Sequence, residues 1–177
     1  MMNLVFLGFG SNKGNKLNYM LEAIYELIAG GKFKVVNISK FYETKPLGEI
    51  EQQDFINCVV SFKTKLNLKE VFEYTKQLES RLGRKKSHKR WGPREIDIDI
   101  LFFNDLIYKD EELEIPHKEM LKRDFVMIPL KEIAKDFIHP GINIAVKNID
   151  TAGLDKFIIK HYTTDLKNFA GEVIGGY

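Results

Sequence analysis

The order of the expected strands and helices along the chain constrains its fold more than any other feature. Each kind of element is identified by its own spacing of apolar residues. Four segments have the apolar pattern of a buried strand, and two others have the spacing of an amphipathic helix. In chain order, the expected elements are a strand at 3–9, a helix at 15–30, strands at 33–42 and 54–64, a helix at 67–82 and a strand at 95–103. This β-α-β-β-α-β order predicts an α+β fold with the ferredoxin-like arrangement, a mainly antiparallel sheet with helices packed on it.

The rest of the chain is expected to add helical material to the same domain. The apolar spacing of residues 123–134 predicts a helix in which Pro129 marks a turn or a kink. Residues 141–177 contain no repeat and no motif that supports an assignment. A chain of 177 residues that is 44% hydrophobic is long enough for one domain with a substantial core and short for two. We therefore predict a single domain over residues 1–177.

Charge, hydropathy and cysteine content exclude several classes of protein. The net charge of +2 lacks the strong positive balance that is typical of proteins that bind nucleic acid or anionic membranes. No apolar run approaches the ~20 residues that span a bilayer, and no secretory signal pattern is visible. Cys58 is the only cysteine, so an internal disulfide is excluded. These features predict a cytoplasmic protein without nucleic-acid or membrane partners. The oligomeric state does not follow from the sequence, and a monomer is favoured.

The last strand of the expected sheet carries two carboxylates among apolar residues. Asp97 and Asp99 alternate with Ile96, Ile98 and Ile100, so both acids point to the same face of the strand. Such a pair can hold one or two hard cations, and Mg²⁺ prefers one or two carboxylates together with water and substrate phosphates. The pattern therefore indicates a site for a metal-nucleotide complex. The alternative is a strand with one solvent-exposed face, because two alternating acids are by themselves a weak signal.

A basic segment leads directly into this strand. Residues 83–94 contain no acid and six basic residues, which are Arg84, Lys85, Lys86, Lys89, Arg90 and Arg94. Arginine suits phosphate because it can form two parallel hydrogen bonds, so cations beside a carboxylate pair are expected where a polyphosphate bridges them. The alternative is a solvated basic loop, which leaves the aromatic Trp91 within the segment unexplained.

Two residues of the third expected strand have the chemistry that a flat heterocycle requires. Phe55 and Asn57 share a strand face, where the ring supplies an apolar surface and the amide both donates and accepts hydrogen bonds. The pair suits a pterin or a purine, and ordinary packing explains Phe55 alone equally well. His117 fits a structural and a functional role equally. Residues 10–15 lack the sequence of a phosphate-binding P-loop, so we interpret them as a tight turn.

Seven short motifs occur in a fixed order along the chain. They are GSN (10–12), FYETKPLG (41–48), QQDFINCV (52–59), LESRLGR (78–84), RWGPREIDIDIL (90–101), IPH (115–117) and RDFVMIPLKEIA (123–134). Together they resemble the 6-hydroxymethyl-7,8-dihydropterin pyrophosphokinase family of the folate pathway. The resemblance implies an enzyme that transfers pyrophosphate from ATP, its co-substrate, to a pterin alcohol with the help of two Mg²⁺ ions.

The same resemblance implies a role for individual residues. Asp97 and Asp99 would bind the two Mg²⁺ ions that carry ATP, and Arg84 and Arg94 would stabilise the charge that develops during transfer. The nucleotide site would be lined by Lys76, Glu79, Lys86, Ile100, His117 and Arg123. The pterin would be enclosed by Thr44, Leu47, Phe55, Asn57, Trp91 and Phe125.

Three residues depart from the pattern of the family. Lys45 stands where the family often has proline, and Lys118 stands where it often has proline or tyrosine. Glu112 stands where a basic contact to the nucleotide can occur.

Two other functions account for part of the pattern. Another Mg²⁺-dependent nucleotide transferase would use the two aspartates, but it would not explain Phe55 together with Asn57. A ferredoxin-like RNA-binding module would stack bases on Phe55 and follow phosphates with the basic segment, but two acids on the binding face argue against it.

Overall fold

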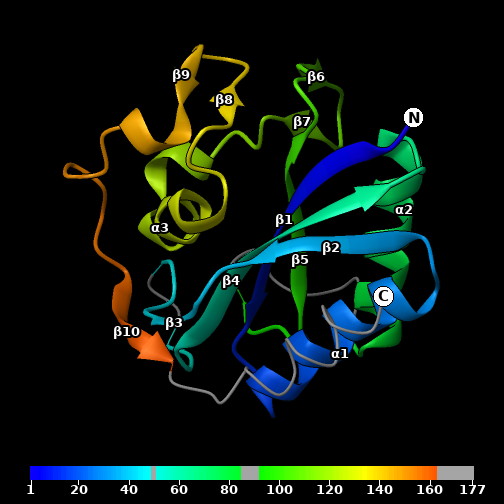
Figure 1. Ribbon diagram of the computed structural model, residues 1–177. Helices are drawn as coiled ribbons and strands as arrows, with labels where there is room; N and C mark the ends of the chain where they lie inside the picture. Colours follow the sequence, from blue (N-terminus) through cyan, green and yellow to red (C-terminus); the bar gives the residue numbers. More distant parts are fainter. Residues whose placement is uncertain (49–50, 85–91, 163–177) are drawn as a thin grey trace.

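A six-stranded antiparallel sheet lies at the centre of the computed structural model, which describes residues 1–48, 51–84 and 92–162. Its strands are β1 (Asn3–Ser11), β2 (Phe33–Ile38), β3 (Phe41–Thr44), β4 (Phe55–Thr64), β5 (Asp97–Phe103) and β10 (Ile158–Tyr162). Their order is β10-β3-β4-β1-β5, and β2 also pairs with β4 (Figure 1). All these pairings are antiparallel, which confirms the predicted antiparallel α+β architecture.

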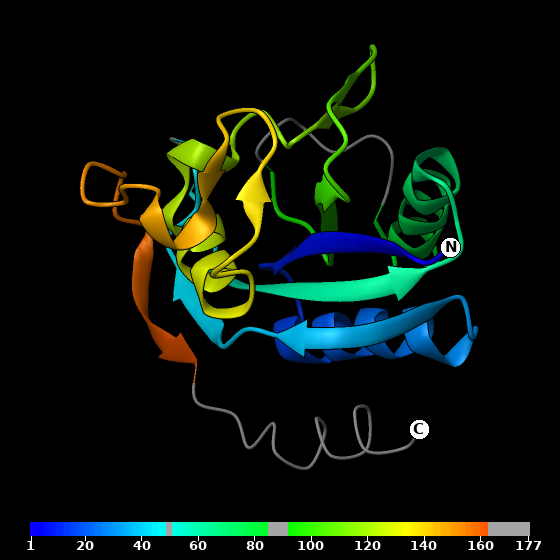
Figure 2. The same ribbon diagram turned by 45° about the horizontal axis from the view of Figure 1, so that its top comes forward.

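Within the described ranges, three α-helices cover the two faces of the sheet. α1 (Lys16–Ala29) and α2 (Leu68–Arg81) pack on one face, and α3 (Asp124–Ile133) packs on the other (Figure 2). The smaller elements are β6 (Tyr108–Lys109), β7 (Glu114–Ile115), β8 (Ile138–His139), β9 (Ile144–Ala145) and the 3-10 helices η1 (Met120–Lys122) and η2 (Val146–Asn148). None of the described helices has both the length and the apolar character needed to cross a membrane.

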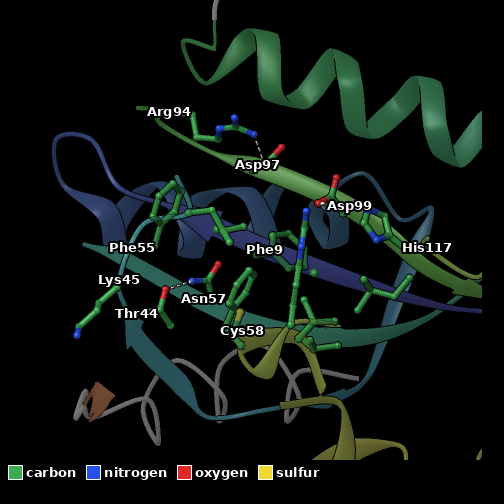
Figure 3. A pocket seen from close by; sticks show the side chains of 18 of the residues that line it. Phe9, Thr44, Lys45, Phe55, Asn57, Cys58, Arg94, Asp97, Asp99 and His117 are labelled. Atoms are coloured by element: carbon green, nitrogen blue, oxygen red, sulfur yellow. Dashed lines mark hydrogen bonds and ion pairs between the residues drawn. The ribbon is translucent and has the colours of Figure 1, made fainter. Parts of the chain in front are cut away.

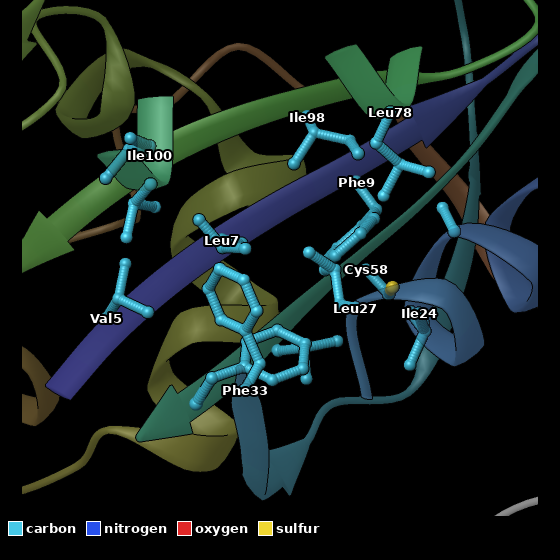
Figure 4. Close-up of a cluster of buried hydrophobic side chains, with 14 of the residues drawn as sticks. Val5, Leu7, Phe9, Ile24, Leu27, Phe33, Cys58, Leu78, Ile98 and Ile100 are labelled. Atoms are coloured by element: carbon cyan, nitrogen blue, oxygen red, sulfur yellow. The ribbon is translucent and has the colours of Figure 1, made fainter. Parts of the chain in front are cut away.

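Alternation along the strands assigns side chains to two hydrophobic cores in the described part of the chain. On β4, the side chains of Ile56, Cys58, Val60 and Phe62 enter the core beneath α1 and α2, as the sequence predicts (Figure 4). Val59 enters the second core, beneath α3. The face of β4 that carries Phe55 and Asn57 is therefore the face toward α3, and a pocket lies on this side of the sheet.

Side-chain caps fix the starts of the helices on the first face. At α1, Asn15 Oδ1 accepts a hydrogen bond from the backbone N–H of Asn18 at 3.2 Å. At α2, Asn67 Oδ1 accepts from the N–H of Glu70 at 3.0 Å, and Glu70 Oε2 accepts from the N–H of Asn67 at 2.7 Å. Such a reciprocal capping box satisfies two N–H groups that the helix leaves unpaired, and a cap contributes about 1 kcal/mol. Both caps lie at the first residues of the helices that the sequence predicts at 15–30 and 67–82.

The predicted single strand at 33–42 is wrong, because the structure divides it into β2 and β3. At the break, the N–H of Ser39 donates to the carbonyl of Val59 at 2.9 Å, and the N–H of Val59 donates to Ser39 Oγ at 2.9 Å. At this position Ser39 Oγ accepts the hydrogen bond of β4 that a backbone carbonyl would accept in a regular sheet. The two strands meet β4 in different registers as a result.

Other boundaries also differ from the sequence prediction. β1 continues to Ser11 instead of ending at residue 9, and β5 begins at Asp97 instead of residue 95. Pro129 does not make a turn, because α3 continues past it to Ile133. A proline inside a helix costs about 3 kcal/mol. The helix continues despite this cost, and Pro129 is itself buried.

The segment without motifs contributes a strand that the sequence analysis missed. β10 pairs with β3 at the edge of the sheet, with Ile158 opposite Thr44 and Tyr162 opposite Phe41. Its path along the side of the molecule is clear in Figure 1. Residues 163–177 lie outside the described part of the chain. The C-terminal region to residue 162 therefore belongs to the same sheet as β1.

We expect His139 to lower the stability of the protein at acid pH. The ring is 4% exposed and packs edge-on against Phe102, with 5.2 Å between the ring centroids. Burial lowers the pKa of His139 below its usual 6.5, so the unfolded chain takes up a proton at a higher pH than the folded protein. The stabilisation is complete above pH 6.5 and is lost as the pH falls through the lower folded pKa.

Chemical denaturation of the wild type and of His139→Gln at several pH values between about 5 and 8 tests this expectation. The free energy of unfolding should fall more steeply toward acid pH in the wild type than in the variant. Parallel curves would show that His139 does not contribute to the acid sensitivity.

Candidate active site

A pocket on the α3 side of the sheet brings together most of the residues that the sequence predicts for the site. The cavity has a volume of about 270 Å³ and is bounded by β1, β4, β5 and the start of α3 (Figure 3). The predicted residues that line it are Thr44, Leu47, Phe55, Asn57, Lys76, Arg84, Arg94, Asp97, Asp99, His117, Arg123 and Phe125. The acids therefore face a pocket, and not an open solvent face of a strand.

Of the other four predicted site residues, Glu79 and Ile100 do not line the pocket with their side chains, and the other two are not described by the structure. Ile100 is 3% exposed and packs into the core beneath α1 and α2, so a ligand in the pocket can meet only its backbone. Glu79 is buried behind β5. Lys86 and Trp91 lie outside the described residues.

Asp97 lies between two arginines. Arg84 Nη1 is 2.5 Å from Asp97 Oδ1, and Arg94 Nη1 donates a hydrogen bond to Asp97 Oδ2. Burial alone would raise the pKa of Asp97, but Arg94 and Arg84 hold it below its usual 3.8. The carboxylate is therefore charged at neutral pH, and two guanidinium groups are already arranged around an anion.

Asp99 is the more open of the two acids. Its side chain is 37% exposed, and His117 Nε2 lies 4.0 Å from Asp99 Oδ2. Burial lowers the pKa of His117 below its usual 6.5, so its ring is neutral at pH 7. The carboxylate of Asp99 thus faces the pocket beside a neutral ring that does not cancel its charge (Figure 3).

The two carboxylates fit a hard divalent cation. In the sheet register, Asp97 lies opposite Gly10 and Asp99 lies opposite Gly8. Because glycine has no side chain, no side chain of β1 stands directly opposite either acid, and both acids line the cavity. Each carboxylate oxygen can accept more than one bond, so Asp97 can contact a cation and keep its arginines.

A buried carboxylate behind β5 holds this arrangement in place. Glu79 Oε1 accepts a hydrogen bond at 2.7 Å from the N–H of Ile98, the residue between the two aspartates. The same oxygen lies 2.5 Å from Arg84 Nη1 and 3.0 Å from Lys76 Nζ. Burial raises the pKa of Glu79 above its usual 4.5, although Lys76 and Arg84 oppose the shift. Glu79 therefore fixes β5 and Arg84 from behind.

The other end of the pocket combines an amide with two aromatic rings. Asn57 Nδ2 donates to Thr44 Oγ1 at 2.7 Å, and both side chains are buried. Asn57 Oδ1 lies over Gly10, where a Cβ would come within 2.7 Å of it. Phe55 and Phe125 supply apolar surface to the same cavity. A flat polar heterocycle is the kind of ligand that such an end can enclose.

Several lining residues were not predicted. Gly8, Gly10, Lys45 and Gln52 line the cavity, and Gln52 Oε1 accepts a hydrogen bond from Asn12 Nδ2 at 2.8 Å. The alternating glycines of β1 are a signal that sequence analysis can use, because they leave one face of a strand bare. No such signal marks Gln52 in its loop.

Of the three residues that depart from the family pattern, Glu112 and Lys118 do not line the pocket. Glu112 is exposed in the turn between β6 and β7, where its N–H donates to Asp110 Oδ1 at 2.9 Å. Lys118 is also exposed. Lys45 is different, since it lines the cavity close to Thr44 (Figure 3).

Comparison with known proteins identifies the family to which the chain belongs. The sequence model described as 7,8-dihydro-6-hydroxymethylpterin-pyrophosphokinase (HPPK) matches residues 6–135. A protein of Aquifex aeolicus named 2-amino-4-hydroxy-6-hydroxymethyldihydropteridine pyrophosphokinase is 42% identical over 139 residues, which cover 78% of this chain and 85% of the relative. The Bacillus subtilis protein of the same name is 41% identical over 135 residues and covers 76% of this chain and 80% of its own length.

Longer proteins contain a similar part. The folic acid synthesis protein FOL1 of Dictyostelium discoideum is 40% identical over 147 residues, which are 83% of this chain but only 22% of that protein. Among solved structures, wild-type Plasmodium falciparum HPPK-DHPS with SDX-DHP is similar in fold, with a TM-score of 0.64 and 17% identity over 84% of this chain and 44% of that one. The sequence match over 6–135 and the two relatives of similar length show that the chain belongs to the 7,8-dihydro-6-hydroxymethylpterin-pyrophosphokinase family.

Proposed function

We propose that this protein transfers pyrophosphate from ATP to 6-hydroxymethyl-7,8-dihydropterin in folate biosynthesis, giving AMP and the pterin pyrophosphate. One observation carries the proposal. A carboxylate pair with two arginines and an amide with two aromatic rings share a single cavity, so a polyphosphate and a heterocycle can lie side by side in it. The names of the relatives from Aquifex and Bacillus support the same reaction.

The pterin is proposed to bind between Phe55 and Phe125. Asn57 Nδ2 donates one of its two hydrogens to Thr44, and Asn57 Oδ1 is the atom of this amide that can accept hydrogen bonds from the pterin. Leu47 closes the same end of the cavity. Enclosure by these side chains would orient the hydroxymethyl group toward the two aspartates.

The triphosphate is proposed to bind at the other end. Asp97 and Asp99 would hold the two Mg²⁺ ions, which supply positive charge to the phosphates when they are bound. Arg84 and Arg94 already surround an anion and would stabilise the charge that builds up on the transferred group. Lys76, His117 and Arg123 line the cavity where the rest of the nucleotide would lie. The backbone of Ile100 is proposed to contact the nucleotide as well.

The reaction needs no covalent intermediate with the protein. The hydroxymethyl oxygen would attack the β-phosphorus of ATP in line and lose its proton to solvent. A bond between this oxygen and the β-phosphorus would form, the bond from the β-phosphorus to the oxygen that bridges it to the α-phosphorus would break, and AMP would leave with that bridging oxygen. Phosphoryl transfer of this kind depends mainly on positioning and on charge stabilisation. A rigid strand that presents two metal-binding carboxylates would supply the positioning, and the bound Mg²⁺ ions together with Arg84 and Arg94 would supply the charge stabilisation.

Incubation with Mg-ATP and the hydroxymethyl-dihydropterin, followed by separation of the nucleotides, tests the proposal. AMP is the expected nucleotide product. Formation of ADP would overturn the proposal in favour of ordinary kinase activity. A filter-binding assay with RNA at moderate salt tests the RNA-binding alternative, for which we expect no retention.

Phe55→Ala is expected to weaken pterin binding by ~1 to 3 kcal/mol, the scale of lost aromatic stacking, with ATP binding nearly unchanged. Calorimetry with each ligand separately measures both affinities. Tyr25→Ala is the control, because Tyr25 is an aromatic residue that is 59% exposed on α1 and does not line the cavity. Equal losses for pterin and ATP in Phe55→Ala would indicate a folding defect instead of lost stacking.

The remaining features of the protein are proposed on the same basis. The strand order β5-β1-β4-β3 supports the ferredoxin-like arrangement, with β10 as an addition at the edge. The pairing of β10 with β3 supports one domain over residues 1–177. We further propose a cytoplasmic monomer whose partners are the small molecules ATP and pterin, without nucleic-acid or membrane partners.

A further inference from the structure

The C-terminal residues 154–158 lie against both walls of the pterin end of the pocket. One wall follows β3 and contains Thr44, Lys45 and Leu47, and the other is the start of α3 with Phe125. These walls are far apart in the sequence. Because residues 154–158 contact both of them, this segment is named the C-terminal brace.

The brace is fixed to the α3 wall by a buried carboxylate and by ring packing. Asp124 is 5% exposed, and its Oδ2 accepts hydrogen bonds from the N–H groups of Phe157 at 2.9 Å and Ile158 at 3.0 Å. The ring of Phe157 packs edge-on against Phe125, with 5.7 Å between the centroids and 83° between the planes. Asp155 also forms a backbone bridge with Arg123. The two residues that precede Phe125 are thus held by the brace as well.

The brace is fixed to the β3 wall by backbone pairing. The N–H of Lys45 donates to the carbonyl of Phe157 at 2.9 Å. At the next position, Ile158 lies opposite Thr44 in the register of β10 and β3. Thr44 is therefore flanked by Ile158 on one side and by Phe55 of β4 on the other. One residue, Phe157, connects the two walls through its ring, its N–H and its carbonyl.

We propose that the C-terminal brace positions the pterin site, with Phe157 as the positioning residue for Phe125 and for the backbone at Lys45. The proposal rests on the proposed function. A lining ring that is already fixed in the free protein loses less conformational freedom on binding, so preorganisation raises affinity without any contact between the brace and the ligand. Asp97, Arg84 and Arg94 lie at the other end of the cavity, so the effect concerns the pterin more than ATP.

Phe157→Ala is expected to raise the dissociation constant for the pterin about ten-fold, which corresponds to about 1.4 kcal/mol. The dissociation constant for a non-hydrolysable ATP analogue with Mg²⁺ should stay within about two-fold of the wild type. Calorimetry measures both. Phe157→Tyr keeps the ring and should restore most of the pterin affinity.

Phe137→Ala is the matched control for loss of a packed phenylalanine. Phe137 is partly buried against the second core, where its ring packs against Phe6 at 5.0 Å and Phe102 at 4.7 Å, and it does not line the cavity. We expect this variant to lower the melting temperature and to leave both affinities close to the wild type. A similar pterin-specific loss in both variants would contradict the proposal.

Asp124 gives an independent test of the same connection. Asp124→Ala removes the acceptor of two backbone hydrogen bonds, whereas Asp124→Asn keeps an oxygen at that position. The alanine variant should lose pterin affinity as Phe157→Ala does, and the asparagine variant should lose less. Equal losses of pterin and ATP affinity would show a folding defect and would overturn the positioning role.

The outcomes separate the brace from the proposed function. If the wild type forms AMP but Phe157→Ala binds the pterin with wild-type affinity, the brace proposal fails and the function stands. If the wild type binds the pterin without forming AMP, the proposed reaction fails, and the affinities of the variants still decide whether the brace positions the site. If the wild type does not bind the pterin, both proposals fail.

Discussion

Asparagine in place of Asp97 or Asp99 is expected to reduce the rate of AMP formation on the order of 10² to 10⁴-fold. Each substitution preserves the shape of the side chain and removes one negative charge from the proposed Mg²⁺ site. Charge stabilisation by a metal contributes several kcal/mol to a transition state, and each 1.36 kcal/mol is about a factor of ten in rate. Turnover at saturating Mg²⁺ measures the loss. If either variant keeps most of the wild-type turnover, the metal assignment is wrong.

The structure predicts that the two variants differ in stability. Asp97 is the shared partner of Arg84 and Arg94, so Asp97→Asn removes a carboxylate partner from both arginines, although Arg84 keeps Glu79, and should lower the melting temperature. Asp99 lies beside a neutral His117, so Asp99→Asn should melt near the wild type. Asp105→Asn, an exposed change just after β5, is the control for both measurements.

The shared orientation of Asp97 and Asp99 was predictable because successive side chains of a strand alternate between its two faces. Ile98 and Ile100 had to face a core, so Asp97 and Asp99 had to face away from it together. The same rule placed Phe55 beside Asn57 on β4. Antiparallel neighbours then brought these two faces into one cavity, which the element order implied. Short-range patterns therefore determined both ends of the candidate site.

The contacts that support the site were not predictable by the same means. Glu79 looked like any helical acid, and only the packing of α2 against β5 aims it at the N–H of Ile98. β10 has no apolar alternation, and its partner β3 is far away in the sequence. Likewise, the resemblance assigned Ile100 to the nucleotide site without showing that its side chain enters the core. Such contacts depend on tertiary packing and not on local periodicity.

Alanine in place of Gly10 is expected to weaken pterin binding by about ten- to a hundred-fold, or about 1.4 to 2.8 kcal/mol. A Cβ at this position would lie 2.7 Å from Asn57 Oδ1, so the amide must move. It cannot move freely, because it is buried and its Nδ2 is hydrogen-bonded to Thr44. Gly8→Ala is the matched control on the same face of β1, since the atoms nearest to its Cβ would be those of the Leu101 side chain, at an ordinary 3.6 Å. Calorimetry with the pterin should show a much smaller loss for Gly8→Ala.

A double-mutant cycle separates this steric mechanism from general damage to β1. Asn57→Ala removes the oxygen that the new methyl group would strike, and it weakens pterin binding by itself because the proposed acceptor is lost. If the clash explains the effect of Gly10→Ala, adding that substitution to Asn57→Ala should cost little more, because the two changes act through one contact. If Gly10→Ala costs the same in both backgrounds, the glycine matters for the strand or for direct contact with the ligand, and the role of Asn57 Oδ1 above Gly10 must be abandoned.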